Sequence, residues 1–264
     1  MNELSLERKY ELYQAAVQAP DFDVKFFLKE YKRLRKKNPI VLREDFCGTG
    51  YLSCTWVKKD PNHKAIGLDL DPEPINYGKA HHYEKLSKDA QKRMTYIECN
   101  VLNSKKYKAD IVAALNFSFC LLKDRNDLKK YFSQVKTSLN KDGLFIMDLF
   151  GGSECMSPIE DIVEHKNFTY YWDCDDFNPI TNECVYKIHF KEKGKRNKIK
   201  DVFVYDWRLW SIPEIKEILL EVGFKDVIVY WEGEEKDGTG NGKFKPTKIT
   251  ENCLAWIVYI VGVI

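Results

Sequence analysis

The sequence lacks a long apolar run and lacks an excess of charge of either sign. A membrane span needs about 20 consecutive apolar residues, whereas the apolar stretch at residues 254–264 is much shorter and is typical of a buried strand. Lys and Arg number 42 against 40 Asp and Glu, a net charge of +2. No charged-then-apolar signal pattern opens the chain. We therefore expect no membrane association and find no general charge argument for nucleic acid.

The eight cysteines lack the spacings that hold metals. No Cys-x-x-Cys pair occurs, and the five histidines do not stand at zinc spacing from cysteine. The chain is also long for a disulfide-stapled scaffold. We therefore expect reduced cysteines, no metal site and a cytoplasmic protein.

The glycine pattern of nicotinamide-binding proteins is also missing. The first predicted strand is followed by Gly48-Thr-Gly50, but position 53 is Ser rather than Gly, which disfavours a dehydrogenase. A glycine turn at this place still lets backbone N–H groups approach a ligand.

The rest of the chain alternates strands with helices. Two helices, separated near Pro20, are predicted within residues 5–38 and form an N-terminal helical cap over residues 1–38. Strands are predicted over 40–42, 65–68, 94–97, 110–115 and 144–147, with helices over 51–59, 72–86 and 127–139. This order predicts a parallel sheet covered on both faces. A helix to residue 222, a strand over 226–231, a loop over 232–248 and a strand over 253–260 follow.

An antiparallel insertion, about residues 153–206, interrupts this order. Its three predicted strands cover 168–172, 184–190 and 202–205 and are rich in aromatic residues. Its second turn is basic, as is the run over residues 31–37. An exposed hairpin tip explains the basic turn, and a helix C-terminus, which favours positive charge, explains the basic run. A nucleic-acid contact is the alternative.

Asp69 ends the second strand about 20 residues after the glycine turn. A carboxylate there can accept both hydroxyls of a ribose. The alternative role, helix N-cap, suits Asp71 before Pro72 better.

This combination resembles the class I S-adenosylmethionine-dependent methyltransferases. Glu44-Asp-Phe-Cys-Gly-Thr-Gly50 aligns with their acidic-x-Gly-x-Gly-x-Gly motif, with Phe46 at the first glycine. The resemblance covers most of residues 39–150 and 207–262. It implies one α/β domain over residues 1–264: a Rossmann-like, seven-stranded, mostly parallel sheet with helices on both faces and the antiparallel β insertion after strand five. The seventh strand is expected beside the sixth and antiparallel to it.

A narrower similarity rests on four separated motifs. Residues 42–50 and 69–71, Tyr205-Asp-Trp-Arg-Leu-Trp210, and Trp231-Glu-Gly with Gly240-Asn-Gly242 look like a group of bacterial methyltransferases of unassigned substrate.

The superfamily resemblance implies a role for each matching residue. The methionine part of S-adenosylmethionine is expected at Glu44, Phe46, Cys47, Gly48 and Gly50. The ribose is expected at Asp69, the adenine at Leu70, Asn100 and Val101, and the methyl end at Asn116 and Phe117.

Methyl transfer by in-line displacement needs positioning more than a nucleophile, so no diagnostic catalytic residue is expected. Asn116 and Ser118 are the candidates. Asn116-Phe-Ser-Phe119 resembles the Asn/Asp-Pro-Pro-aromatic motif of base amino methyltransferases but lacks both prolines. Nothing nearby in the sequence would activate Cys47 as a catalytic thiol.

The acceptor is expected against the aromatic insertion. Tyr13, Trp172, Trp207 and Arg208 are the candidates, since a ring of aromatics cradles a cation such as an amine. Dimerisation through the added strands is the alternative use of the insertion. We expect methyl transfer to N or O of a small molecule. The alternatives are a nucleic-acid base amino group and a non-catalytic S-adenosylmethionine-binding protein.

Overall fold

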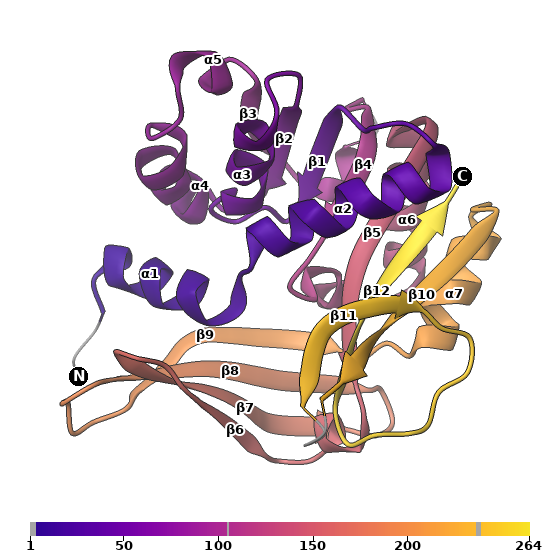
Figure 1. Cartoon of the computed structure of the whole chain (residues 1–264). Helices are drawn as coiled ribbons and strands as arrows, with labels where there is room; N and C mark the ends of the chain where they lie inside the picture. Colours follow the sequence, from indigo (N-terminus) through magenta and orange to yellow (C-terminus); the bar gives the residue numbers. More distant parts are fainter. Residues whose placement is uncertain (1–3, 105, 236–238) are drawn as a thin grey trace.

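The computed structural model describes residues 4–104, 106–235 and 239–264, and its strands form two sheets (Figure 1). Sheet A contains β1 (Val41–Asp45), β2 (Lys64–Asp69), β3 (Met94–Glu98), β4 (Ala109–Ala114), β5 (Leu139–Gly151), β10 (Asp226–Glu234), β11 (Gly240–Pro246) and β12 (Trp256–Val263). Sheet B contains β6 (Glu160–Glu164), β7 (Phe168–Asn178), β8 (Glu183–Glu192) and β9 (Ile199–Arg208).

The α-helices lie before, between and after these strands. They are α1 (Leu6–Val17), α2 (Pro20–Arg35), α3 (Tyr51–Lys59), α4 (Pro72–Gly78), α5 (Lys88–Gln91), α6 (Arg125–Ser138) and α7 (Ile212–Glu221). The short turns are a π turn, η1 (Lys79–Tyr83), and three 3₁₀ turns, η2 (Val101–Asn103), η3 (Ser118–Leu121) and η4 (Ser153–Met156).

Sheet A has the order β11-β10-β12-β5-β4-β1-β2-β3. The strands from β5 to β3 are parallel, and β12 runs antiparallel between β5 and β10. This confirms the α/β class and the expected antiparallel strand. The continuous apolar run of β4 is fully buried except at its second residue, because helices cover both faces of the sheet.

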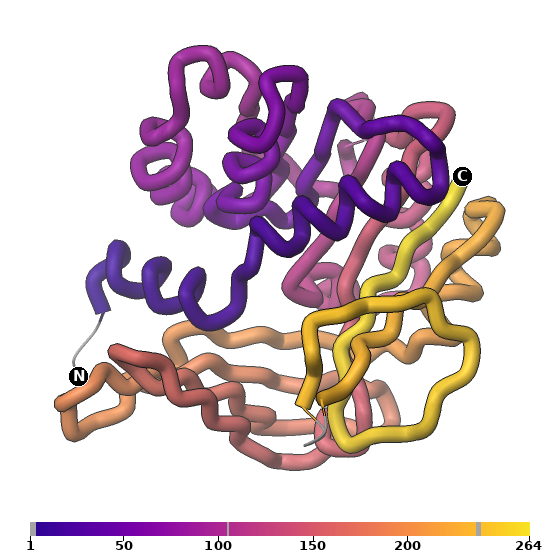
Figure 2. Tube along the Cα trace, in the orientation of Figure 1, coloured from indigo at the N-terminus to yellow at the C-terminus, as the bar shows by residue number. Residues whose placement is uncertain are grey.

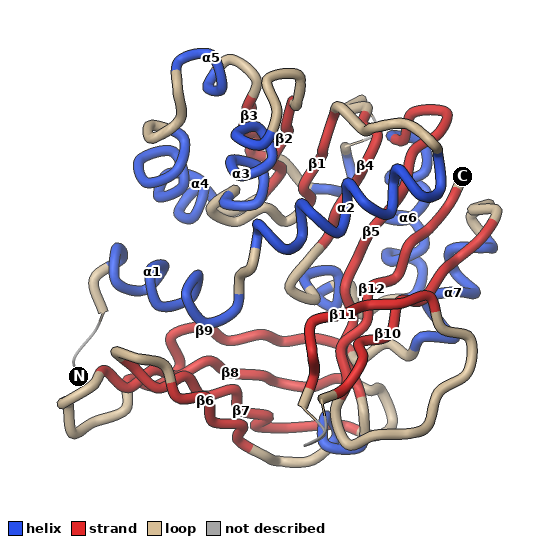
Figure 3. The backbone as a smooth tube through the Cα atoms, in the orientation of Figure 1, coloured by secondary structure: helices blue, strands red, loops and turns tan. Residues whose placement is uncertain are grey.

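Each face of sheet A has its own hydrophobic core. On one face, Phe27 of α2 and Trp56 of α3 pack with residues of β1, β4 and β5. On the other face, Phe132 of α6 and Ile218 of α7 pack against the same strands. Figure 3 shows α2 crossing one side of the strands, with α6 and α7 on the other.

Sheet A has eight strands within the described residues, one more than predicted. The segment predicted as a loop over 232–248 contains the edge strand β11, which pairs antiparallel with β10; residues 236–238 of that segment lie outside the described residues. The glycines of β11 favour a loop, but the Phe244 ring packs 4.8 Å from the Tyr259 ring. This long-range contact overrides the local propensity.

Three other features differ from the sequence prediction. Sheet B has four described strands rather than three, because the short, polar β6 pairs along β7 at the edge. The helix predicted over 72–86 gives way at Gly78 to η1, where the His82 ring stacks on Tyr51 at 4.6 Å. The final strand begins at Trp256 rather than at residue 253.

Helix α1 lies between sheet B and the helices of sheet A (Figure 2). Arg8 Nε donates to Glu192 of β8 at 2.8 Å, and the Tyr13 ring lies 4.7 Å from Phe203 of β9. On its other side the Tyr10 hydroxyl donates to Glu73 of α4 at 2.9 Å. These contacts place the N-terminal segment over the same end of sheet A as the insertion, namely the carboxyl ends of its parallel strands.

The described cysteines are all free. Among the described helices, no segment combines the length and apolar character that a bilayer crossing requires.

Candidate active site

The turn after β1 is the centre of the expected cofactor site. Gly50 N donates to Cys47 O at 2.7 Å, and Cys47 N donates to Leu68 O of β2 at 2.9 Å. The glycines have φ angles of 51° at Gly48 and 62° at Gly50, the left-handed region that glycine adopts readily. The turn therefore lies at the carboxyl ends of β1 and β2.

The two turn glycines have different surroundings. A Cβ at Gly50 would lie 2.5 Å from the Tyr96 ring, so Gly50 serves packing. A Cβ at Gly48 would meet nothing within 4 Å, so the backbone there faces open space. That open backbone fits the close approach of a ligand.

Phe46 occupies the first motif position in the left-handed conformation, at a φ of 56°. Its ring packs 5.5 Å from the Tyr131 ring of α6. This packing offsets the cost of the left-handed backbone, about 1–3 kcal/mol. Phe46 thus holds a backbone conformation that glycine adopts more readily.

A buried ion pair stabilises β1, the strand that precedes the turn. Arg43 and Asp45 are fully buried on β1, and Arg43 Nε lies 2.8 Å from Asp45 Oδ1. Arg43 Nη2 donates to Asp45 Oδ2 at 2.8 Å, and the Tyr131 hydroxyl donates to the same oxygen at 2.9 Å. The strand that carries the turn is thereby fixed to α6.

Asp69 is the last residue of β2 and Leu70 follows it, beside the turn. Asp69 accepts hydrogen bonds from Gly48 N at 2.7 Å and from Asp71 N at 2.9 Å. Leu70 is 64% exposed, which leaves an apolar side chain open to an adenine ring. Asp71 is the N-cap of α4 and accepts from Glu73 N, as predicted, whereas ribose binding by Asp69 stays a prediction.

The residues expected at the adenine lie after β3. Asn100 is exposed and its Oδ1 caps η2 by accepting from Leu102 N at 2.9 Å. Val101 is buried in the core beneath it. The amide of Asn100 therefore lies at the surface, at the same edge of the sheet as Leu70.

The segment after β4 is held by a carboxylate that the sequence analysis missed. Asp148 of β5 accepts from Asn116 N and Phe117 N, both at 2.9 Å. These two residues are left-handed, with φ angles of 56° and 57°. The Ser118 hydroxyl donates to Leu115 O at 2.7 Å, a local bond that favours a structural role over a catalytic one.

Asp148 lies in an acidic environment. Burial raises its pKa to about 7, although the hydrogen bonds from Phe117 and Asn116 lower it, and Asp23 of α2 raises it further. Its position directly after the predicted strand 144–147 was the available signal, since ligands of such sheets bind beyond the carboxyl ends of the strands.

Glu44 lies one residue before the end of β1 in the same region. It is buried, and its Oε2 accepts from Ser53 N at 2.9 Å and from the Ser53 hydroxyl at 2.5 Å. Burial raises the pKa of Glu44 to about 8. Burial likewise raises the pKa of the Cys47 thiol, so Cys47 is a neutral thiol and not a nucleophile.

The aromatic side chains of sheet B form a continuous wall. The rings of Trp172 and Tyr205 lie 5.9 Å apart, and those of Tyr205 and Trp207 lie 4.4 Å apart. Phe117 reaches this wall at Trp207, 6.4 Å between centroids. Tyr13 of α1 lies against it and interacts electrostatically with Asp148. The structure thus brings the predicted aromatic acceptor residues close to the segment after β4.

Arg208 has a different environment. Its guanidinium lies 3.8 Å above the Trp210 ring, Nη2 donates to Glu214 at 3.1 Å, and Nη1 donates to Lys123 O. These partners tie β9 to α7 and favour a structural role for Arg208 at the end of the insertion over contact with the acceptor.

Gln14 links α1 to the turn. Its Nε2 lies 2.8 Å from Thr49 Oγ1 and 2.8 Å from His82 Nε2. Burial and nearby lysines lower the pKa of His82 to about 4, so this ring is neutral and accepts the bond. The cap is therefore hydrogen bonded to the turn.

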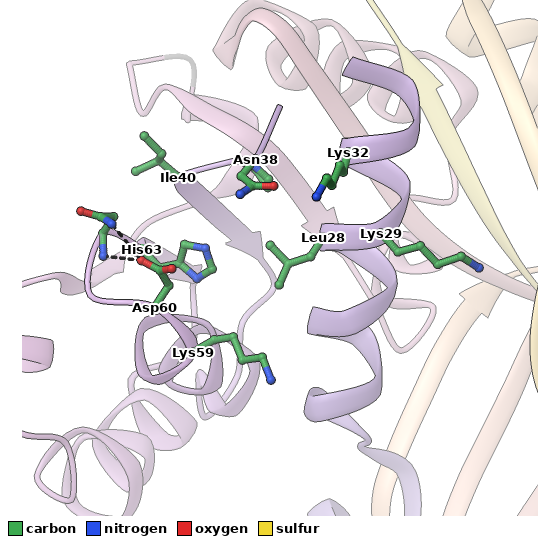
Figure 4. A pocket seen from close by; sticks show the side chains of 10 residues that line it. Leu28, Lys29, Lys32, Asn38, Ile40, Lys59, Asp60 and His63 are labelled. Carbon is green, nitrogen blue, oxygen red and sulfur yellow. Dashed lines mark hydrogen bonds between the residues drawn. The ribbon is translucent and has the colours of Figure 1, made fainter. Parts of the chain in front are cut away.

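A further hollow lies elsewhere. It measures about 550 Å³ and is lined by Lys29, Lys32, Ile40, Lys59 and His63 among others (Figure 4). Residues 38–40 precede β1 and residues 60–63 precede β2, so this hollow lies at the amino ends of the strands. It is at the opposite end of the sheet from the glycine turn.

The comparison with protein families decides the assignment. Residues 44–205 match the family model described as a methyltransferase domain. The chain belongs to this methyltransferase family. It is an S-adenosylmethionine-dependent methyltransferase, and the matched segment begins at Glu44 and extends through sheet B.

Solved structures share the methyltransferase fold. An S-adenosylmethionine-dependent methyltransferase from Clostridium acetobutylicum ATCC 824 has a TM-score of 0.68 and 16% identity, covering 96% of this chain and 97% of that one. The sugar N-methyltransferase KedS8 from Streptoalloteichus sp ATCC 53650 has a TM-score of 0.61 and 16% identity, with 100% and 93% covered. CalS10, an amino pentose methyltransferase from Micromonospora echinaspora, has a TM-score of 0.65 and 11% identity, with 98% and 99% covered. Comparison with curated proteins finds no match.

The residues of the site fit the methyltransferase cofactor. The backbone at Gly48 faces open space, and Leu70 has an exposed apolar side chain. Glu44 has a buried carboxyl, and the charged groups that act on it are acidic. When bound, S-adenosylmethionine supplies an electrophilic methyl group on a sulfonium. The buried carboxyls favour that positive charge because a desolvated carboxylate gains most from a cation.

Proposed function

We propose that this methyltransferase methylates an amine nitrogen of a small molecule held between the cap and sheet B. The observation that carries the proposal is the half-buried carboxyl of Asp148, which acts on Tyr13 of α1, while Tyr13 in turn bonds to Tyr205 of the aromatic wall. A carboxylate and π faces both attract an ammonium group. A hydroxyl acceptor would gain less from either.

Asp148 supplies the proton chemistry that an amine needs. An amine arrives protonated at neutral pH and must lose a proton before its nitrogen can attack a methyl group. A carboxylate with a pKa of about 7 accepts a proton at that pH. Its backbone hydrogen bonds to Asn116 and Phe117 hold it in place for that transfer.

The names of the structural relatives support the same acceptor class. KedS8 is described as a sugar N-methyltransferase and CalS10 as an amino pentose methyltransferase. We therefore propose an amino sugar or a similarly polar amine as the acceptor.

Methylation of nucleic acid and dimerisation through sheet B have less support. The lysines that line the large hollow lie at the opposite strand ends from the site, so they do not favour methylation of a nucleic-acid base. The inner face of sheet B packs on α1 of the same chain, which supports an acceptor cover. A homodimer would use the exposed edge strand β6, where Ile162 is 57% exposed.

The test is methyl transfer from methyl-labelled S-adenosylmethionine to matched acceptors. An amino sugar, the same sugar with a hydroxyl in place of the amine, and its N-acetyl derivative are compared. We expect label only on the free amine. Transfer to the hydroxyl sugar at an equal rate would contradict the proposal.

The pH profile of the amine reaction tests Asp148 itself. In the native enzyme, kcat/KM should rise as pH increases through about 7, because Asp148 must be ionised. The Asp148→Asn variant should lose this limb and fall at least about 100-fold at pH 7.5, within the usual range for a general base. Binding of S-adenosylhomocysteine reports that the variant is folded. An unchanged profile would remove Asp148 from the proposal.

A further inference from the structure

A small cavity of about 20 Å³ lies where the N-terminal cap meets the carboxyl ends of β1 and β4. Its lining comes from the α1–α2 junction (Gln18, Pro20 and Asp23), from Glu44 and Leu52, and from Leu115 and Asn116. A cavity of this size accommodates about one small polar group. It adjoins the cofactor site because Glu44 belongs to both.

Each acidic or amide side chain of this cavity keeps one oxygen without a hydrogen-bond donor among the described residues. Gln18 Oε1 is buried without a hydrogen-bond partner among the described residues. Asp23 Oδ1 accepts from the Tyr259 hydroxyl at 2.5 Å, and Glu44 Oε2 accepts from Ser53. Within the described ranges, the second oxygen of each carboxyl has no hydrogen bond. The cavity is therefore rich in free acceptors.

Among the described residues, the main influences on the pKa values of the two carboxyls are burial, hydrogen-bond donors and other acids. Burial raises the pKa of Asp23 to about 6 and that of Glu44 to about 8. The charged groups that act on Glu44 are Asp23 and Asp69, and both raise its pKa. Buried carboxylates are stable when paired with a cation that donates hydrogen bonds.

We propose that Asp23 and Gln18 of the N-terminal cap, together with Glu44, bind the ammonium group of the cofactor's methionine portion. An ammonium has three N–H donors and no acceptor, and the cavity presents three residues with an unoccupied acceptor oxygen. The proposal rests on S-adenosylmethionine as the cofactor and is independent of the acceptor's identity. It makes the cap a part of the cofactor site.

The test measures the contribution of the ammonium to affinity. S-adenosylhomocysteine is compared by calorimetry with its deaminated analogue, which keeps the adenosine, thioether and carboxylate. The Asp23→Asn variant should weaken binding of S-adenosylhomocysteine by about 10–100-fold, the usual loss of a hydrogen bond to a charged group. It should change binding of the deaminated analogue by less than about threefold.

Asp21→Asn is the matched control, since Asp21 is an exposed aspartate in the same first turn of α2. It should leave both affinities unchanged. Gln18→Leu removes the unpartnered oxygen without touching α2 and should reduce the preference for the ammonium several-fold. This variant decides the question if Asp23→Asn does not fold.

The outcomes separate this proposal from the cofactor assignment. Native protein that binds neither ligand overturns the assignment of the cofactor site. Native protein that binds both, with variants that weaken both equally or neither, overturns only the role of Asp23 and Gln18.

Discussion

At the scale of single residues, burial decides the properties of the site. Asp69 and the turn glycines could be predicted because their residue types follow the ends of predicted strands. Asp23 and Gln18 could not, because they reach the site only through the packing of α2 on sheet A. Asp148 could have been predicted in the same way as Asp69, since it directly follows the predicted strand 144–147.

The pKa of Glu44 gives a prediction about stability. Its folded pKa of about 8 exceeds the ordinary value of 4.5, so the folded protein binds the proton more tightly than the unfolded chain. The resulting stabilisation is fully present below pH 4.5 and is lost as pH rises towards and past 8. The Glu44→Gln variant should therefore lose less stability between pH 5.5 and 8.5 than the native protein.

Urea denaturation at the two pH values measures this difference. A shift of one pKa unit corresponds to about 1.4 kcal/mol. Between the two pH values, the urea midpoint of the native protein should therefore fall further than that of Glu44→Gln, by several tenths of a molar or more. Equal losses in both proteins would show that Glu44 is not held in its neutral form.

At the scale of elements, β1 depends on an ion pair that the sequence alone does not reveal. Arg43 and Asp45 are two apart on a strand that reads as apolar only at its start, and their burial depends on Tyr131 of α6. Sequence patterns located β1, α3 and β2, but they missed β6 and β11. Those edge strands are polar or glycine-rich and are held by their partner strands.

Removing the charge of Asp45 should destabilise the fold. The Asp45→Asn variant leaves Arg43 buried without its counter-charge, at a cost of about 3–5 kcal/mol. Asp142→Asn breaks the exposed pair with Lys37 and should have a much smaller effect. Denaturant titration of both variants measures the two costs. Similar small losses would contradict a structural role for the buried pair.

Helix α1 should become more rigid when the cofactor site is filled. It contacts the turn through Gln14 and sheet B through Arg8, and the α1–α2 junction lines the cavity beside Glu44. Hydrogen exchange of α1 amides should slow at least several-fold with saturating S-adenosylhomocysteine. Helix α7, on the opposite face of sheet A, is the internal control. An α1 that exchanges equally with and without ligand would contradict this coupling.

At the scale of the whole molecule, the two sheets and the cap meet at one end of sheet A (Figure 1). The carboxyl ends of β1, β2, β4 and β5 bring Glu44, Asp69, Asn116 and Asp148 there, and sheet B adds the aromatic wall. The parallel sheet was predictable from the alternation of strands and helices, and the antiparallel last strand from the family resemblance. The acidic character of this end was not, since the chain as a whole is nearly neutral.

The most direct test of the account is a calorimetric titration with S-adenosylhomocysteine. The native protein, Asp69→Ala and Asp71→Ala are compared, since these two aspartates lie two residues apart and only Asp69 borders the turn. We expect micromolar binding to the native protein and to Asp71→Ala, and a loss of at least about 100-fold for Asp69→Ala, as for a charged group bound to two hydroxyls. Equal affinity in all three proteins, or no binding to folded native protein, would contradict a cofactor site at the carboxyl ends of β1 and β2.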